Sequence, residues 1–260
     1  MSHRQHVDGS AGDADYGTIG SGYTNYRQPD KEIAQYILTA LGRAKTIINV
    51  GAGAGSYEPT DRSVTPVEPS SSMRAQRPSY LAPAVDAAAE KLPFDDRSFD
   101  GALATFTVHQ WANLSAGLAE MRRVSRGPVV VLSCDPQSLQ CGWLPMYAAE
   151  MIAVEASRYP PIDRIAAGLG GKVEVTSIPI PLHCTDGFSE AYYGRPEALL
   201  DPGARKANSA WSFVKADVEN RFVSMLRRDL DNGSWDERFG YLRKLPKLEG
   251  SLRLIVSTPA

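Results

Sequence analysis

The feature that most constrains the fold is a short β-branched segment that leads directly into a glycine loop. Residues 46–50 read TIINV, and Gly51-Ala52-Gly53-Ala54-Gly55 follows without a break. A β-branched apolar run of this length predicts a buried strand. The glycines lack a Cβ, so the backbone can turn tightly and a ligand can approach it closely. In an open parallel sheet, such a ligand binds beyond the carboxyl ends of the strands.

Strands and helices alternate around this loop. We expect further strands at 64–67, 84–88, 99–107, 128–134, 172–180 and 251–258, and helices at 29–42, 70–76, 114–124 and 143–158. This alternation predicts a doubly wound α/β fold with a mostly parallel sheet covered on both faces.

The segment 186–240 is too long for a simple connection between the last two strands. It is rich in aromatic and charged residues and is expected to be helical. We expect it to be an insertion that caps the mouth of a substrate site. A peripheral helical decoration or a dimer interface remains open as an alternative.

Length and composition favour one globular domain. The chain has 260 residues, a formal net charge of −2, 43% hydrophobic and 22% charged residues. We expect a disordered tail at 1–14 and a single domain at 15–260. The charge argues against a general nucleic-acid partner, and no apolar run is long enough to span a membrane. We expect a monomer or homodimer.

The cysteines and the first residues favour a cytoplasmic protein. Cys134, Cys141 and Cys184 are odd in number and contain no closely spaced pair, which fits neither a disulfide framework nor a metal site. No apolar leader segment stands at positions 1–15.

An acidic residue follows the next predicted strand, as a nucleoside cofactor requires. Glu68 stands at the end of the strand expected at 64–67, directly after Val67. At this position its carboxylate can accept hydrogen bonds from both ribose hydroxyls. The competing cofactor is NAD. Its glycine pattern would place a third glycine at position 56, which is Ser56, and Glu58-Pro59 interrupts the following helix. Both points disfavour a dinucleotide.

These motifs, in order, resemble those of the class I S-adenosylmethionine (SAM)-dependent methyltransferases, particularly the type 11 group. The matching segments are Asn49–Gly55, the sequence Val67-Glu68-Pro69-Ser70, Ala89–Phe94 followed by Ser98-Phe99-Asp100, Phe106–Trp111 and Glu120–Val124. The resemblance covers residues 16 to 135.

The resemblance implies a Rossmann-like, seven-stranded sheet in the order 3-2-1-4-5-7-6, with the last-added strand antiparallel. It also implies SAM as the cofactor, and no metal. The residues expected to hold SAM are Tyr16, Tyr23, Arg27, Asn49, Gly51, Ala52, Gly53, Glu68, Pro69, Met73, Ala89, Glu90 and Thr105. Among them, Arg27 is the candidate partner of the SAM carboxylate, with a solvated surface arginine as the alternative.

Two positions depart from the family pattern. The family usually has Asp or Glu where this chain has Asn49, which brings no charge for the SAM ammonium. It often has Asp where this chain has Ala88, so adenine would be held by backbone groups near Ala89 and Glu90.

Methyl transfer needs a base only when the nucleophile carries a proton. His109 is the candidate catalytic base, because it stands at the end of the fourth expected strand and has a suitable reference pKa. A histidine that only shapes the pocket wall is the alternative. The candidate substrate residues are Trp111, His183, Tyr193, Arg195 and Trp211, although ordinary packing or surface roles are open for each of them.

Together, these observations favour a SAM-dependent methyltransferase of a small specialised metabolite. Two alternatives remain open at this point: C-methylation of an olefinic isoprenoid such as a prenyl diphosphate, and a protein that binds SAM without transferring a methyl group.

Overall fold

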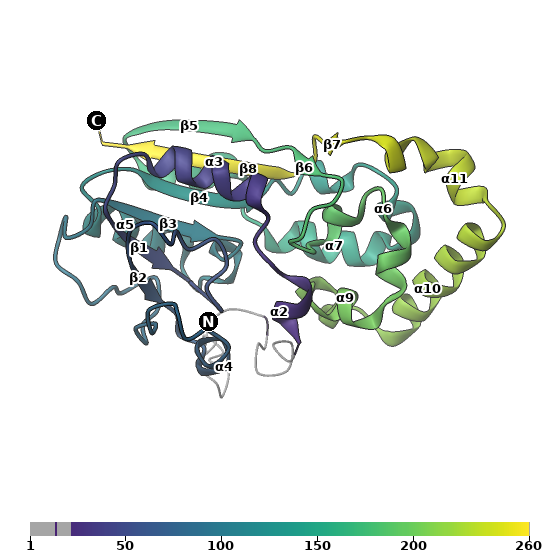
Figure 1. The fold of residues 1–260 in the computed structure, drawn as a ribbon, viewed down its shortest axis with the longest axis horizontal. Coiled ribbons are helices and arrows are strands. Elements are labelled where there is room, and N and C mark those ends of the chain that lie inside the picture. The colour runs from purple at the N-terminus through teal and green to yellow at the C-terminus, as the bar shows by residue number, and fades with distance from the viewer. Residues whose placement is uncertain (1–13, 15–21, 260) are drawn as a thin grey trace.

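The strand that precedes the glycine loop lies inside a mostly parallel sheet (Figure 1). The computed structural model describes Ala14 and residues 22–259. Its strands are β1 (Thr46–Val50), β2 (Ser63–Val67), β3 (Gly101–Thr105), β4 (Val129–Cys134), β5 (Lys172–Ser177), β6 (Ile180–Pro181), β7 (Lys247–Leu248) and β8 (Leu252–Thr258). Six of them form one sheet in the order β2-β1-β3-β4-β8-β5, and β6 pairs with β7.

The sheet confirms the expected doubly wound topology, with one strand fewer. The pairs β1–β2, β1–β3 and β3–β4 are parallel, whereas β8 runs antiparallel to both β4 and β5, as expected for the last-added strand. The strand expected at 84–88 is wrong: only Val85 forms an isolated bridge, to Val67. Pro83 precedes this alanine-rich segment, and neither residue type favours a strand.

Some of the helices begin where an apolar face and a capping side chain coincide. The α-helices are α2 (Tyr23–Tyr26), α3 (Lys31–Leu41), α4 (Ser71–Ala75), α5 (Leu114–Val124), α6 (Leu144–Tyr147), α7 (Ala149–Arg158), α8 (Ile162–Leu169), α9 (Pro202–Lys206), α10 (Ala216–Asp231) and α11 (Ser234–Phe239). The 3-10 helices are η1 (Val108–Gln110), η2 (Ser138–Gln140), η3 (Ser189–Tyr192), η4 (Pro196–Leu200), η5 (Ser209–Phe213) and η6 (Gly240–Lys244). Asp30 caps α3 and Asn113 caps α5 through their side chains, which satisfies backbone N–H groups of the first turn.

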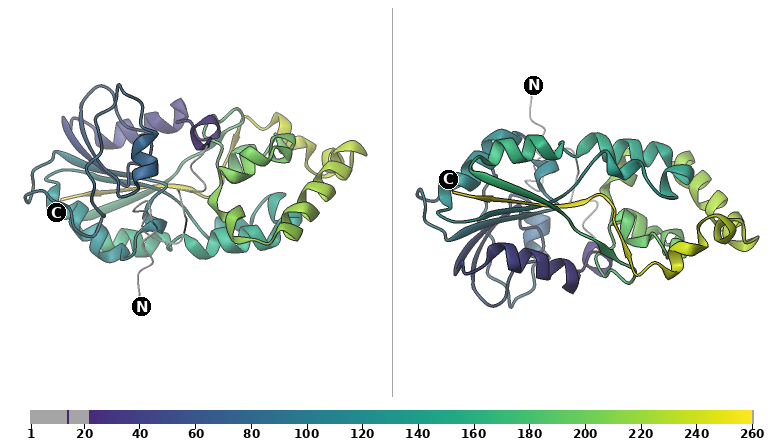
Figure 2. Two further views of the ribbon diagram at one scale, coloured as in Figure 1. Left: turned by 90° about the horizontal axis from the view of Figure 1, so that it is seen from below. Right: turned by 90° about the horizontal axis from the view of Figure 1, so that it is seen from above.

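Alternating strand residues build two hydrophobic layers, one on each face of the sheet. Ile47 and Leu103 pack with α3 on one face, whereas Ile48 and Ala102 pack with α5 and α8 on the other. Figure 2 shows the sheet edge-on between these helices. Successive side chains of a strand point to opposite faces, so strands covered on both sides must be apolar throughout.

The segment 186–240 is helical, as expected, and with α6 and α7 it forms a helical lobe beyond one end of the sheet (Figures 1 and 2). Its core contains Trp143, Phe222 and Trp235, which belong to the same hydrophobic cluster as α3. Trp143 meets Trp235 edge-on, with 5.7 Å between the ring centroids. The lobe and the sheet therefore share one continuous core.

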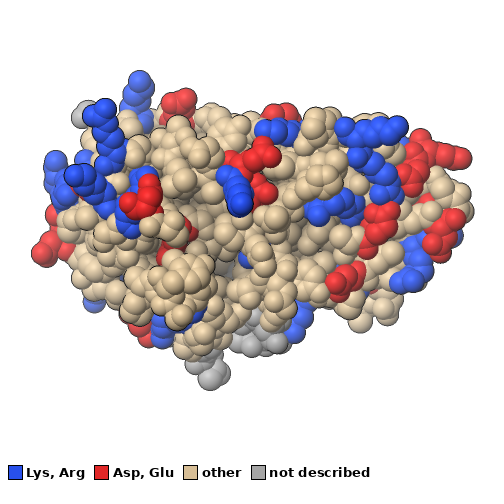
Figure 3. Space-filling model, viewed as in Figure 1, with Lys and Arg blue, Asp and Glu red and all other residues tan. Residues whose placement is uncertain are grey.

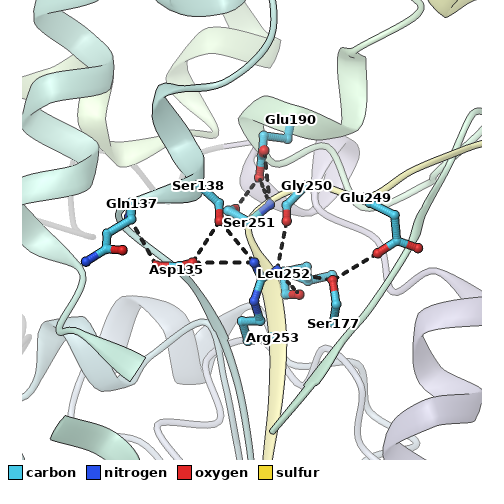
Figure 4. Close-up of polar contacts among 10 residues, drawn as sticks. All are labelled: Asp135, Gln137, Ser138, Ser177, Glu190, Glu249, Gly250, Ser251, Leu252 and Arg253. Carbon is cyan, nitrogen blue, oxygen red and sulfur yellow. Dashed lines mark hydrogen bonds and ion pairs between the residues drawn. The ribbon is translucent and has the colours of Figure 1, made fainter. Parts of the chain in front are cut away.

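Polar contacts join the lobe to the sheet at the start of β8 (Figure 4). Glu190 of η3 accepts hydrogen bonds from the backbone N–H and the hydroxyl of Ser251. Beside this contact, Arg253 pairs with Asp135, which follows β4. The carboxyl end of β4 and the first residues of the insertion are thereby held together.

None of the described helices has both the length and the apolar character needed to cross a bilayer.

On the face drawn in Figure 3, acidic and basic side chains are interspersed over the helical lobe. The expected tail at 1–14 lies outside the described residues, apart from Ala14, which is buried.

Candidate functional site

The glycine loop and Glu68 meet at the carboxyl ends of β1 and β2. The Glu68 carboxylate accepts hydrogen bonds from the backbone N–H of Gly53 and that of Ser70, both at 2.8 Å. Gly51 and Gly53 have φ angles of 70° and 51°, a conformation that residues with a side chain rarely adopt. A Cβ on Gly51 would lie 2.0 Å from the Thr107 hydroxyl oxygen. This turn therefore requires glycine and brings backbone N–H groups to the sheet edge.

A first pocket opens over this loop and encloses about 860 Å³, including its mouth. All the expected cofactor residues line it except Tyr16, which lies outside the described residues, and Asn49. It is lined by Tyr23, Arg27, Gly51, Ala52, Gly53, Ala54, Ser56, Glu68, Pro69, Ser70, Met73, Ala88, Ala89, Glu90, Thr105, Phe106, Thr107, Gln110, Trp111 and Asp186. Burial raises the pKa of Glu68, although the two backbone N–H groups oppose that shift.

Asn49 lies beneath the loop, next to a carboxylate that sequence reasoning missed. Its Nδ2 donates to Glu58 at 3.0 Å, and Glu58 forms a buried ion pair with Arg77. The Asn49 Oδ1 atom is buried and accepts no hydrogen bond from the described residues. Glu58 therefore supplies an acidic group close to the position where Asn49 replaces the usual acid.

Arg27 and Asp186 close one side of the first pocket. Their side chains form an ion pair, and Asp186 also accepts a hydrogen bond from the Tyr57 hydroxyl at 3.0 Å. The Arg27 guanidinium carbon lies 5.5 Å from the centre of the Tyr23 ring and 5.2 Å from that of Phe106. Arg27 is therefore largely buried and engaged, and the surface-arginine alternative is wrong.

A second, smaller pocket of about 410 Å³ adjoins the first, and the two share Tyr23, Arg27 and Phe106. Phe106 follows β3 with a φ of 51°, a strained conformation of the kind that clusters at functional sites. The second pocket is lined by Tyr23, Arg27, Phe106, His109, Glu155, Arg158, Tyr159, Phe188, Ala207, Asn208 and Ser209. It therefore combines residues from the sheet, from α7 and from the insertion.

His109 and Glu155, which line the second pocket, have pKa values shifted toward their neutral forms. Burial and the nearby Arg158 and Arg27 guanidinium groups hold the pKa of His109 well below its usual range. The His109 ring contacts the Tyr159 ring in a tilted arrangement, with 4.4 Å between the centroids and 44° between the planes. Burial also raises the pKa of Glu155. At neutral pH His109 is therefore an uncharged imidazole.

Comparisons with known proteins agree with this geometry. Residues 48–130 match the family model of a methyltransferase domain. A structure from Anabaena variabilis, described as a methyltransferase from an antibiotic biosynthesis pathway, is 29% identical with a TM-score of 0.83, over 90% of this chain and 99% of that one. The matched domain and the shared fold support a class I SAM-dependent methyltransferase.

More distant structures share the fold of this methyltransferase. A SAM-dependent methyltransferase from Thermotoga maritima is 14% identical with a TM-score of 0.54, over 94% of this chain and 95% of that one. Phosphoethanolamine N-methyltransferase 2 from Haemonchus contortus is also 14% identical, with a TM-score of 0.53, over 94% of this chain and 56% of that one. Among curated proteins, none matches the sequence.

The first pocket of the methyltransferase fits its cofactor SAM. Each Glu68 oxygen already accepts one backbone N–H, and a carboxylate has room for about two more donors, such as ribose hydroxyls. A Cβ on Gly53 would lie 3.3 Å from the end of the Met73 side chain, so a larger residue at this position would crowd Met73. The buried Oδ1 atom of Asn49, which accepts no hydrogen bond from the described residues, is a further acceptor at the carboxyl end of β1.

The expected substrate residues of the methyltransferase are dispersed. Trp111 lines the first pocket, and His183 is exposed and lines neither pocket. Tyr193, Arg195 and Trp211 also line neither. The Tyr193 hydroxyl donates to the Leu245 carbonyl, Arg195 donates to the carbonyls of Cys184 and Ala191, and Trp211 packs on Phe222. These three side chains hold the lobe together.

Sequence reasoning missed Glu155, Arg158 and Asn208, which line the second pocket. One signal was present for Glu155: it follows Met151 by four residues, on the buried face of the helix 149–158. An acidic residue on the apolar stripe of a helix is a marker of a site, because burying an unpaired carboxylate is costly. Nothing comparable marks Asn208, whose position depends on how the insertion folds back.

Proposed function

We propose that this methyltransferase transfers a methyl group to a compact small molecule that binds in the second pocket. The single observation that supports the proposal most directly is the wall that the first and second pockets share, which consists of Tyr23, Arg27 and Phe106. A cofactor and an acceptor in these two pockets would meet at that wall. Positioning the two reactants and excluding water is the main task of such an enzyme.

In this proposal the residues around the glycine loop hold the cofactor. Glu68 accepts from the ribose hydroxyls, the glycine loop lets the amino-acid part approach the backbone closely, and Arg27 donates its remaining N–H groups to the carboxylate. Bound SAM supplies an activated methyl group on a sulfonium leaving group. Ala88, Ala89 and Trp111 give the adenine an apolar surface.

The composition of the second pocket favours a polar acceptor. Glu155, Arg158 and Asn208 line the second pocket, and these polar side chains suit a small polar molecule better than a long olefinic isoprenoid. The proposal therefore ranks methylation of such a molecule above the C-methylation of a prenyl diphosphate. A macromolecular acceptor would need a wider opening.

We further propose that the segment 186–240 acts as a cap on a single domain. Phe188, Ala207, Asn208 and Ser209 of this segment contribute to the wall of the second pocket. The cytoplasm suits the three free cysteines, of which Cys141 is exposed. A monomer or a homodimer, with no nucleic-acid partner, completes the proposal.

Transfer of a labelled methyl group tests the proposal. The protein is incubated with SAM carrying an isotopically labelled methyl group and with the small-molecule fraction of a cell extract. We expect the label in one or a few products of low mass, and none when Glu68→Ala is used in place of the wild type. Label found only in the protein or nucleic-acid fraction would overturn the small-molecule acceptor.

A further inference from the structure

Among the described residues that line the second pocket, Glu155 is the one carboxylate, and it has few hydrogen-bond partners. The side chain is only 8% exposed. The Ser189 hydroxyl donates to its Oε2 at 3.0 Å, and no described residue donates to its Oε1 or forms an ion pair with Glu155. A buried carboxylate with an open oxygen is costly unless a ligand donates to it.

We infer that Glu155 is the catalytic base and that the acceptor presents it with a hydroxyl or amine group. This inference rests on the proposed function, because it requires the acceptor to lie in the second pocket. The Oε1 atom accepts the N–H or O–H of the nucleophile and so orients the lone pair of that atom. The substrate class is therefore a compact molecule methylated on oxygen or nitrogen.

Methyl transfer forms one bond, breaks one bond and moves one proton. A lone pair of the acceptor oxygen or nitrogen forms the new bond to the methyl carbon. The bond from that carbon to sulfur breaks, and its electron pair stays on sulfur in S-adenosylhomocysteine (SAH). The proton of the acceptor passes to Oε1 of Glu155, and solvent receives it after the products leave.

The surroundings of Glu155 suit proton transfer near neutral pH. Burial raises its pKa, which makes it a stronger base than an exposed glutamate, whereas Ser189, Arg158 and Arg27 oppose that shift. Glu190 of η3, Cys134 of β4 and Tyr159 after α7 also lie close enough to interact with its charge.

His109 is the competing base in the same pocket. The two Arg groups and its burial hold its pKa well below the usual range, so His109 is a weak base. The Oε1 atom of Glu155, by contrast, accepts no hydrogen bond from the described residues and is open to the acceptor. We therefore assign His109 to the pocket wall, in contact with Tyr159.

The test compares Glu155→Gln with Glu150→Gln, the same substitution on the exposed side of α7, where Glu150 pairs with Arg221. Two quantities are measured: the SAH dissociation constant, and the rate of label transfer from methyl-labelled SAM to the small-molecule fraction of an extract, as a function of pH. We expect Glu155→Gln to lower that rate by about 100- to 10,000-fold and to abolish its decline at acid pH. Its SAH affinity should change less than about twofold, and Glu150→Gln should match the wild type in both measurements.

A second variant, Ser189→Ala, still tests the inference if Glu155→Gln does not fold. Ser189→Ala removes the hydroxyl that stabilises the ionised Glu155, so the acid limb of the rate profile should move to higher pH. An unchanged acid limb in both variants, or its loss in His109→Gln alone, would overturn the assignment of the base. If the wild type binds SAH but labels nothing of low mass, the proposed function fails, and the assignment of Glu155 fails with it.

Discussion

Arg27 and Asp186, 159 residues apart in the chain, form a buried ion pair at the wall between the two pockets. Their backbones also form an isolated antiparallel bridge, and Gly187 donates to the Tyr26 carbonyl. The segment before α3 and the start of the insertion are therefore fastened to each other at the site. Arg27 thus has a structural role besides its proposed role in binding the SAM carboxylate.

A pair of variants separates these two roles. Arg27→Met leaves a buried carboxylate without its partner and should lower the free energy of unfolding by about 3–5 kcal/mol. Adding Asp186→Asn removes that charge, still offers Tyr57 an acceptor, and should restore most of the stability. If Arg27 binds the SAM carboxylate, SAH affinity stays reduced in the double variant by about 10- to 100-fold. Calorimetry measures the SAH affinity, and chemical denaturation measures the free energy of unfolding. If the double variant recovers SAH affinity as well as stability, Arg27 has a structural role only.

Glu190 should make stability depend on pH. Burial raises its pKa to about 7, so between its unfolded pKa and pH 7 the folded protein holds a proton that the unfolded chain releases. The contribution of Glu190 to the free energy of unfolding is therefore greatest at acid pH. This contribution is lost as the pH rises through about 7. Glu190→Gln should reduce the decrease between pH 5 and 8 by on the order of 1–3 kcal/mol.

The matched control is Glu249→Gln, an exposed residue close to the same contact (Figure 4). Urea denaturation at several pH values measures the free energies of both variants. An identical pH dependence in wild type and Glu190→Gln would mean that Glu190 keeps an ordinary pKa in solution.

The aromatic residues of the insertion should affect stability more than binding. Trp211 is 5% exposed and packs on Phe222, so Trp211→Ala should lower the free energy of unfolding by about 3–5 kcal/mol. Its SAH affinity should remain that of the wild type. Tyr241→Ala, at a position 67% exposed, is the control and should change little. A Trp211→Ala protein with wild-type stability and lost substrate turnover would instead make Trp211 a substrate residue.

The cofactor half of the site could be predicted from the sequence because local signals determine it. The β-branched run, the glycines that need positive φ angles, and Glu68 after the next strand lie within about twenty residues of each other. The regular alternation of strands and helices then determines which sheet edge they share. The strand wrongly expected at 84–88 shows the limit of such signals, because an alanine-rich segment carries little preference of its own.

The acceptor half could not be predicted because it is assembled from distant segments. Glu155, His109 and Asn208 meet only after α7 and the insertion pack against the end of the sheet. The aromatic residues Tyr193 and Trp211 attracted attention as candidate substrate contacts, yet they lie in the core of the lobe. Aromatic content predicts burial well, but it does not distinguish a pocket wall from a packed interior.

The most direct test of the cofactor site is calorimetric titration of SAH into the wild type and into Glu68→Ala. Loss of the ribose acceptor should weaken SAH binding by about 1.5–3 kcal/mol, which is roughly 10- to 100-fold. Asp61→Ala, which removes an exposed carboxylate outside the pocket, should bind SAH like the wild type. NAD should bind to none of the three proteins. An unchanged SAH affinity in folded Glu68→Ala, or a wild type that binds NAD and not SAH, would contradict the site described above.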